Sequence, residues 1–248
     1  MSKARQAADL LAKVRRTGVV LDSFPDDLVP VDRDEIYALQ DALIAALGAV
    51  GGWKIAAASE SAPLCSPLLA SSYLPSGASL DITTNRATIV EVEVGFRFKA
   101  DLPPRGTPYG RDEVLEAIEG ALPALEIVGT RFAADFAVPR TVALGDLQVN
   151  AAVVTGTVVS DWQGLDLANL AVSADVGADH YAVDAGTTKE AIIDALVWLA
   201  NNGAVRQGGL KAGQVVITGA RINKPIGRPG EMVEASLDGL GQVRLMLT

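Results

Sequence analysis

The stretch Val90-Glu91-Val92-Glu93-Val94-Gly95-Phe96-Arg97-Phe98 alternates strictly between large apolar residues and other residues. This period of two, together with the β-branched and aromatic residues, predicts a β-strand. Successive side chains of a strand point to opposite faces, so Glu91 and Glu93 share one face. Their Cα atoms then lie roughly 7 Å apart, close enough for both carboxylates to converge on one cation. The alternative is a solvated polar face on an antiparallel strand.

A third carboxylate, Glu126, lies in the otherwise uncharged run from Ala121 to Gly129. A charged side chain is costly to bury unless it is paired, hydrogen-bonded or bound to a metal. Glu126 therefore either points to solvent, meets an arginine such as Arg131, or joins Glu91 and Glu93 around an ion. Three glutamates suit a hard divalent ion. Mg²⁺ is favoured, because it accepts a few carboxylates and keeps positions open for water and substrate.

Composition and charge limit the classes of function. The chain has 248 residues, 49% of them hydrophobic, which is enough to bury a large core. A net charge of −9 argues against nucleic acid and anionic membranes as partners. No run reaches the roughly 18 apolar residues of a transmembrane helix, and the N-terminus does not resemble a signal peptide. With one cysteine an internal disulfide is impossible, and we expect a cytoplasmic protein.

The single histidine, His180, excludes much chemistry. Histidine-rich zinc sites and two-histidine iron sites cannot be assembled from one chain with one histidine. We expect His180 to be a partly exposed structural residue. Cys65 and His180 could form a nucleophile–base pair, but nothing near either residue supports one, and a buried inert cysteine is the commoner case.

The periodicity predicts an α+β protein with a folded-over β core. Helices are expected over 3–17, after the capping box at 32–35, over 111–121 and from 187 to about 202. Strands are expected near 88–99, 125–130, 147–159, 169–175, 180–184, 214–218, 231–237 and 241–247. We expect a helical N-terminal segment, residues 1–50, and a catalytic β domain, residues 51–248, that together form one compact unit.

Four motifs occur in an order that resembles a known family. They are Gly52-Trp53-Lys54-Ile55, Glu91-Val92-Glu93, the run from Leu122 to Val128, and Val216-Ile217-Thr218-Gly219-Ala220. In this order they resemble the 2-keto-4-pentenoate hydratases, which belong with the 4-oxalocrotonate decarboxylases to the fumarylacetoacetate hydrolase superfamily. The likeness runs over nearly the whole chain. It implies the mixed β-sheet roll of that superfamily's C-terminal domain, with flanking helices.

The resemblance also implies roles for individual residues. Glu91, Glu93 and Glu126 would bind Mg²⁺ or Mn²⁺, and Lys54 would be the active-site lysine. Without the resemblance, Lys54 would be an exposed cation at a strand end. The positions implied to bind substrate are Ile55 (through its backbone), Ser71, Asn150 and Thr218.

Three departures from the family's usual residues fall at substrate-pocket positions. Ser71 stands where the hydratases carry an aspartate, and Ala152 stands where a serine is expected after Asn150. Glu190-Ala191-Ile192 replaces the usual Gly-His-Pro. The metal-binding part of the site is therefore intact in the sequence, while the part that selects the substrate is altered.

The implied chemistry is that of a metal-dependent lyase. A 2-hydroxydienoate or 2-keto acid can chelate a divalent ion, which stabilises the enolate charge while Lys54 moves a proton. Our leading interpretation is a hydratase that adds water to a 2-hydroxy-2,4-dienoate. The alternatives are a decarboxylase of a 2-oxo-3-enedioate and a catalytically weak homologue that acts as partner subunit of a related lyase. A homo-oligomer is expected from the family and from the apolar composition.

Overall fold

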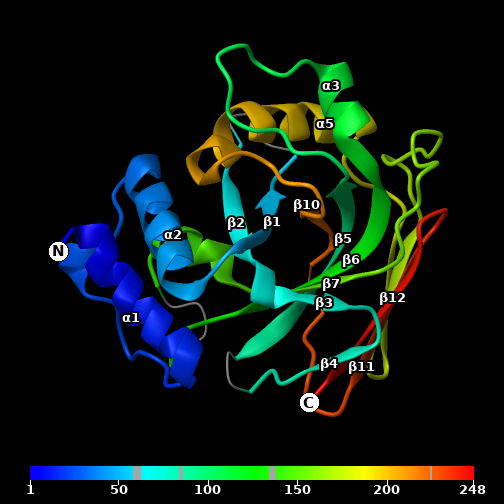
Figure 1. The fold of residues 1–248 in the computed structure, drawn as a ribbon. Coiled ribbons are helices and arrows are strands. Elements are labelled where there is room, and N and C mark those ends of the chain that lie inside the picture. The colour runs from blue at the N-terminus through cyan, green and yellow to red at the C-terminus, as the bar shows by residue number, and fades with distance from the viewer. Residues whose placement is uncertain (58–62, 84–85, 134–137, 224) are drawn as a thin grey trace.

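The computed structural model describes residues 1–57, 63–83, 86–133, 138–223 and 225–248. Two mixed β-sheets form its centre (Figure 1). The larger sheet has the order β2-β1-β10-β5-β6-β7-β3, and the smaller has the order β4-β12-β11-β8-β9. Pairs β1–β10, β3–β7 and β4–β12 are parallel, and the others are antiparallel. The predicted α+β fold with a mixed β-sheet core is confirmed.

The strands of the larger sheet are β1 (Val50–Ile55), β2 (Cys65–Leu69), β3 (Tyr73–Pro75), β5 (Ala87–Phe98), β6 (Ile118–Gly129), β7 (Asn150–Thr155) and β10 (Val215–Ile222). Those of the smaller sheet are β4 (Ala78–Leu80), β8 (Val172–Val176), β9 (Asp179–Val183), β11 (Met232–Leu237) and β12 (Gly241–Leu247).

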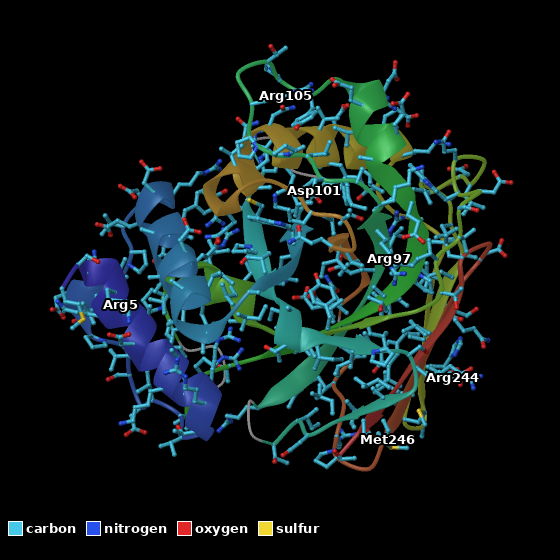
Figure 2. The ribbon with its side chains drawn as sticks, viewed as in Figure 1. Arg5, Arg97, Asp101, Arg105, Arg244 and Met246 are labelled. Carbon is cyan, nitrogen blue, oxygen red and sulfur yellow. The ribbon has the colours of Figure 1, made fainter. Side chains whose placement is uncertain are left out.

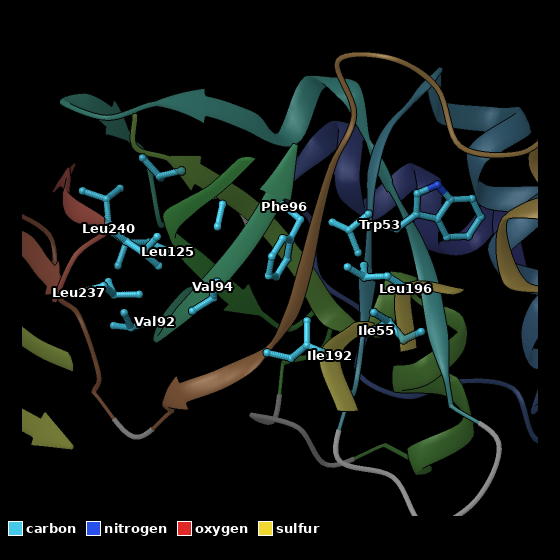
Figure 3. Packing of buried hydrophobic residues seen from close by; sticks show 14 of the residues in the cluster. Trp53, Ile55, Val92, Val94, Phe96, Leu125, Ile192, Leu196, Leu237 and Leu240 are labelled. Atoms are coloured by element: carbon cyan, nitrogen blue, oxygen red, sulfur yellow. The ribbon is translucent and has the colours of Figure 1, made fainter. Parts of the chain in front are cut away.

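Strands β5 and β6 are the long central strands of the larger sheet. Each has 12 residues, and they pair antiparallel along almost their whole length. The apolar residues of β5, such as Val92 and Phe96, belong to one buried cluster. That cluster also contains Leu237 of β11 and Leu196 of helix α5 (Lys189–Trp198) (Figure 3). The smaller sheet and α5 therefore cover the apolar side of the strand that carries Glu91 and Glu93.

Two N-terminal helices lie at one side of the sheets, α1 (Lys3–Thr17) and α2 (Arg33–Leu47) (Figure 1). The Asp32 side chain accepts from the Glu35 amide, as expected of the capping box. Leu11 of α1 and Leu43 of α2 share a buried cluster with Leu69 of β2. The helical segment therefore packs directly on the larger sheet. The division into segments 1–50 and 51–248 stays a prediction.

The remaining helices are short. They are α3 (Arg111–Ala117), α4 (Arg140–Gly145) and the turns Asp26–Leu28, Ala70–Ser72, Leu147–Val149, Leu199–Gly203 and Ala204–Gln207. In the described part of the chain, no helix combines the length and the apolar character needed to cross a bilayer.

The helix expected over 111–121 is wrong in its second half. Helix α3 ends at Ala117, and the next residue already pairs as a strand with Phe98. Gly120 allows the strand to lie close to Val159, because a Cβ at this position would lie 2.5 Å from the Val159 carbonyl oxygen. The strand expected at 125–130 therefore begins at Ile118. No bounds were predicted for β1 to β4, although Lys54 was expected at a strand end, and helix α4 had no counterpart among the predicted elements.

Candidate metal centre

Glu91, Glu93 and Glu126 come together where β5 pairs with β6. Glu91 lies directly opposite Glu126 in the antiparallel register, and Glu93 follows two residues along the same face. One carboxylate oxygen from each residue lies within 4.8 Å of the others. The structure thus gathers the three glutamates that the sequence singled out. We call this group the carboxylate triad.

The triad is largely withdrawn from water. Glu126 is 0% exposed and Glu93 is 1% exposed, while Glu91 is half-buried. The alternative of a solvated polar face on β5 is therefore wrong. So is the pairing of Glu126 with Arg131, because the Arg131 guanidinium lies 3.2 Å from a carboxylate oxygen of Asp146.

Lys54 provides the cation that contacts Glu126. It lies on β1, and its Nζ donates hydrogen bonds of 2.7 and 2.6 Å to the two carboxylate oxygens of Glu126. The Lys54 side chain is 14% exposed. It is therefore a largely covered, paired cation, and the alternative of an exposed lysine at a strand end is wrong.

The pKa values show how strongly the triad lacks positive charge. Burial raises the pKa of Glu91 to about 7, against the opposing charge of Lys54 and with the help of Glu126. Burial, then the Glu126 charge, raises the pKa of Glu93 well above its usual value. Burial by itself lowers the pKa of Lys54, but the three carboxylates outweigh it and the net shift is upward. One ammonium group balances the charge of only one of three carboxylates, so a further cation would be attracted to the triad.

Asn150 and Gly219 hold two of the three carboxylates in place. Asn150, the first residue of β7, donates from its side-chain amide to Glu126 Oε1 at 2.8 Å. The Gly219 amide donates to Glu93 Oε2 at 2.7 Å. Gly219 has a φ of 110°, in the region that favours glycine. The orientation of these carboxylates is therefore fixed by neighbouring hydrogen-bond donors.

The other predicted substrate-binding residues lie in different settings. Thr218 is buried, and its hydroxyl donates to the Val94 carbonyl at 2.9 Å. Ile55 is a buried residue of β1 that pairs with Cys65. Ser71 is exposed in the short turn before β3. The predicted roles of these residues toward a substrate stay predictions.

The departures noted in the sequence also have defined places. Ala152 is buried on β7, and its carbonyl accepts from the Asn150 amide at 3.4 Å. Ile192 is completely buried in the first turns of α5. Isoleucine at this position is therefore a core residue.

Cys65 and His180 do not meet in the structure. Cys65 is buried, with its Sγ 3.8 Å from the Tyr37 hydroxyl. His180 is exposed on β9, and its Nδ1 lies 2.6 Å from an Asp175 carboxylate oxygen. The expectation that His180 is a structural, partly exposed residue fits this position.

Two residues near the triad had no signal in the sequence. Burial and the charges of Glu126 and Glu93 raise the pKa of Tyr73 well above its usual value, so the phenol stays neutral beside the triad. Its hydroxyl donates to the Val215 carbonyl at 2.9 Å. Arg221 is half-buried; burial lowers its pKa and the Glu93 charge opposes this. Tyr73 also lies against β1, because a Cβ at Gly52 would lie 2.2 Å from the phenol oxygen.

The family is identified by a match over most of the chain. The family described as fumarylacetoacetate (FAA) hydrolase C-terminal matches residues 36–248. The chain belongs to this family. The match begins inside α2 and contains every residue of the carboxylate triad as well as Lys54.

Two curated relatives illustrate the range of the family. A 2-keto-4-pentenoate hydratase of Paraburkholderia xenovorans is 30% identical over 156 residues, which are 62% of this chain and 57% of the relative. A 4-oxalocrotonate decarboxylase of a Pseudomonas species is 29% identical over 181 residues, 71% of this chain and 67% of the relative. The match to the hydratase therefore spans little more than half of that enzyme's length.

A solved structure shares the whole fold. The 4-oxalocrotonate decarboxylase of Pseudomonas putida G7, complexed with magnesium and adipate, superposes with a TM-score of 0.78. The alignment covers 100% of this chain and 99% of that enzyme at 20% identity. This likeness shows that the present chain has the same fold as that enzyme over its whole length, including the N-terminal helices.

Proposed function

We propose that this chain is a divalent-metal-dependent lyase that adds water to a 2-hydroxy-2,4-dienoate of the 2-keto-4-pentenoate type. The observation that carries the proposal is the buried carboxylate triad with Lys54 beside it. Membership of the family and the likeness to a hydratase support the reaction class.

The donor set fits Mg²⁺ or Mn²⁺. The triad offers only carboxylate oxygens, which hard divalent ions prefer, and its surplus of negative charge is otherwise relieved by protonation. Glu91, Glu93 and Glu126 would hold the ion. When bound, it would supply the positive charge that stabilises an enolate oxygen in the substrate.

Lys54 Nζ is the atom we assign to proton transfer. Burial lowers the pKa of Lys54 and the carboxylates raise it, so its protonation depends on how much carboxylate charge remains unbalanced. Asn150 keeps Glu126 turned toward Lys54, because its amide donates to the same Oε1 atom that accepts from Nζ. The half-buried Tyr73 phenol, whose pKa is raised, stays neutral beside the triad. Together these residues orient a small acid and limit its contact with water.

A decarboxylase of a 2-oxo-3-enedioate is the second candidate. The half-buried Arg221 lies close enough to Glu93 for the Glu93 charge to oppose the lowering of the Arg221 pKa by burial. An arginine beside the carboxylate triad could attract the second carboxylate of such a substrate. Its guanidinium already donates to the carbonyls of Leu167 and Thr187, at 2.6 and 3.3 Å. Because these hydrogen bonds already engage the Arg221 guanidinium, we favour the 2-hydroxy-2,4-dienoate, which has a single carboxylate, as the substrate.

The setting of the enzyme is also part of the proposal. Its substrate is a small organic acid. We propose that it works in the cytoplasm, consistent with a single buried cysteine, and as a homo-oligomer. A complex with a related lyase is the setting expected if the chain is a catalytically weak partner subunit.

Purified protein incubated with 2-hydroxypenta-2,4-dienoate tests the reaction. Loss of the dienol absorbance is followed with Mg²⁺ and with EDTA, and the product is identified by mass. A gain of one water that requires Mg²⁺ is the expected result. Release of CO₂ from a 2-oxo-3-enedioate, without hydration of the dienoate, would replace the hydratase by the decarboxylase. Inactivity toward both substrates would favour the third interpretation, a catalytically weak partner subunit of a related lyase.

A further inference from the structure

A second buried ionic cluster lies behind the carboxylate triad and includes a residue of the N-terminal helix. Arg15 of α1 places its Nη2 2.8 Å from Asp146 Oδ1, and Arg131 places its Nε 3.2 Å from Asp146 Oδ2. Arg131 and Asp146 are 0% and 1% exposed at their side chains, and Arg15 is 10% exposed. Burying two guanidinium groups is costly, and replacing such clusters by apolar residues is often tolerated. Stability alone therefore does not explain it.

Both arginines also bind the backbone of Asn150. Arg15 Nη1 donates to the Asn150 carbonyl at 3.1 Å, and Arg131 Nη2 donates to the same oxygen at 2.9 Å. The Asn150 side-chain amide then donates to Glu126 Oε1. One residue thus connects the ionic cluster, through its backbone, to the carboxylate triad, through its side chain.

The backbone between Asp146 and Asn150 is strained. Leu147, Gln148 and Val149 have φ values of 50°, 53° and 56°, three consecutive non-glycine residues in the left-handed region. This conformation is unfavourable for L-residues and most of all for the β-branched Val149. It persists only where the surroundings hold it, and here the arginines grip both ends of the turn. We call Leu147–Val149 the left-handed turn.

We propose that Arg15 is a positioning residue for the metal centre. With Arg131 it holds the left-handed turn, and so fixes the Asn150 amide and, through it, the Glu126 carboxylate. Helix α1 lies outside residues 36–248, the part matched by the family. The N-terminal helix therefore completes the site from outside the family domain. The inference rests on the proposed function in one respect, namely that Glu126 is a metal ligand.

Mn²⁺ binding to the metal-free protein tests the proposal. Arg15→Met is expected to weaken Mn²⁺ binding about tenfold, since residues behind a metal ligand typically change affinity by about 10–100-fold. Arg5→Met is the matched control, because Arg5 lies on the outer side of the same helix in an exposed pair with Asp9 (Figure 2). It should leave the affinity unchanged. Equal affinities of Arg15→Met and the parent protein would overturn the proposal.

A destabilised variant separates positioning from stability. Leu196→Ala removes a completely buried side chain of α5, in a different apolar cluster from Leu147 of the left-handed turn, so it should lower the unfolding temperature and keep the Mn²⁺ affinity. If Arg15→Met behaves in the same way, Arg15 is only structural. Arg15→Lys serves if Arg15→Met does not fold, because lysine keeps the charge but cannot bridge Asp146 and Asn150 as a guanidinium fork does.

Hydrogen exchange of the Asn150 side-chain amide reads the coupling without a metal. In metal-free protein we expect this amide to exchange faster in Arg15→Met than in Leu196→Ala, as measured by NMR. Unchanged exchange would overturn the inference. If the parent protein binds no Mn²⁺, the proposed function fails, and the exchange measurement still decides whether Arg15 positions Asn150.

Discussion

Glu93 is a buried carboxylate that destabilises the metal-free protein when it is ionised. Its carboxylate is 1% exposed, and the Gly219 amide is its hydrogen-bond donor in the described structure. Burial, followed by the Glu126 charge, raises its pKa well above the usual range, so ionising Glu93 is less favourable in the folded metal-free protein than in the unfolded chain. A side chain placed in this way favours a bound cation over stability of the empty site.

Glu93→Gln should therefore stabilise the metal-free protein and remove its response to Mg²⁺. Glutamine keeps an oxygen for the Gly219 amide but carries no charge. We expect the unfolding temperature in EDTA at pH 8 to rise by roughly 2–4 °C, which corresponds to about 1 kcal/mol in a chain of this size. Glu234→Gln, at a partly exposed carboxylate on β11, is the control. A drop in the unfolding temperature specific to Glu93→Gln would contradict this explanation.

Glu91 predicts the pH dependence of both stability and metal binding. Its pKa is raised to about 7 from 4.5, so the folded metal-free protein binds more protons than the unfolded chain in this interval. The stability from this group is fully present below pH 4.5 and is lost as the pH rises through about 7. Mg²⁺ competes with the same proton, so its affinity should rise over this range.

Thermal unfolding at pH 5 and pH 8, with EDTA and with Mg²⁺, measures both trends. The stabilisation by Mg²⁺ should be larger at pH 8. Glu91→Gln should flatten the pH dependence in EDTA, because it removes the titrating group. An equal response to Mg²⁺ at both pH values would show that protons and Mg²⁺ do not share the site.

Individual site residues differed in how far the sequence could predict them. The meeting of Glu91 and Glu93 follows from the strand period, and the isolation of Glu126 among apolar residues indicated a buried partner. The contact between Lys54 and Glu126 joins residues 72 positions apart, so only the resemblance to the family suggested it. Tyr73 could not be predicted, because its proximity to the triad depends on the tertiary contact between its side chain and Gly52 of β1.

Strand β6 shows where local pattern and tertiary pairing compete. Its first residues continue the helical pattern of α3, yet they pair with the end of β5. The gain from extending a central strand outweighs local helix propensity, which is a weak preference. The predicted strands at 180–184, 231–237 and 241–247 agree with the structure to within one residue at each end. The bounds of β1 and β2 were not predicted because glycine and proline interrupt the pattern that marks a strand. Strands β3 and β4 have three residues each, too few to show a period.

Strand β1 can carry Lys54 to the triad only if Gly52 stays small. A Cβ at Gly52 would lie 2.0 Å from the Val215 carbonyl oxygen and 2.2 Å from the Tyr73 hydroxyl. Gly52→Ala should destabilise the protein by about 1–3 kcal/mol, as overpacking usually does. Gly106→Ala is the control, because a Cβ at this exposed glycine meets nothing within 4 Å. Equal denaturation midpoints for the two variants would refute the close packing of Gly52 against Val215 and Tyr73.

The whole arrangement depends on pairings between distant parts of the chain. Strand β10 lies between β1 and β5, so the triad and Lys54 share one sheet only after residues 50–55 meet residues 215–222. Local periodicity carries no information on such neighbours. The ordered motifs did, because they placed the chain in a family with a known topology. The ionic cluster of Arg15, Arg131 and Asp146 had no such guide, since none of these three residues lies in the ordered motifs.

Titration of Mn²⁺ into metal-free protein most directly tests whether the carboxylate triad is a metal centre. The parent protein and the control Glu234→Gln should each bind one ion per chain, and Glu91→Gln should bind none at the same concentrations. Loss of binding in Glu91→Gln alone would assign the ion to the triad. Retention of bound Mn²⁺ in Glu91→Gln would contradict that assignment and the lyase mechanism built on it.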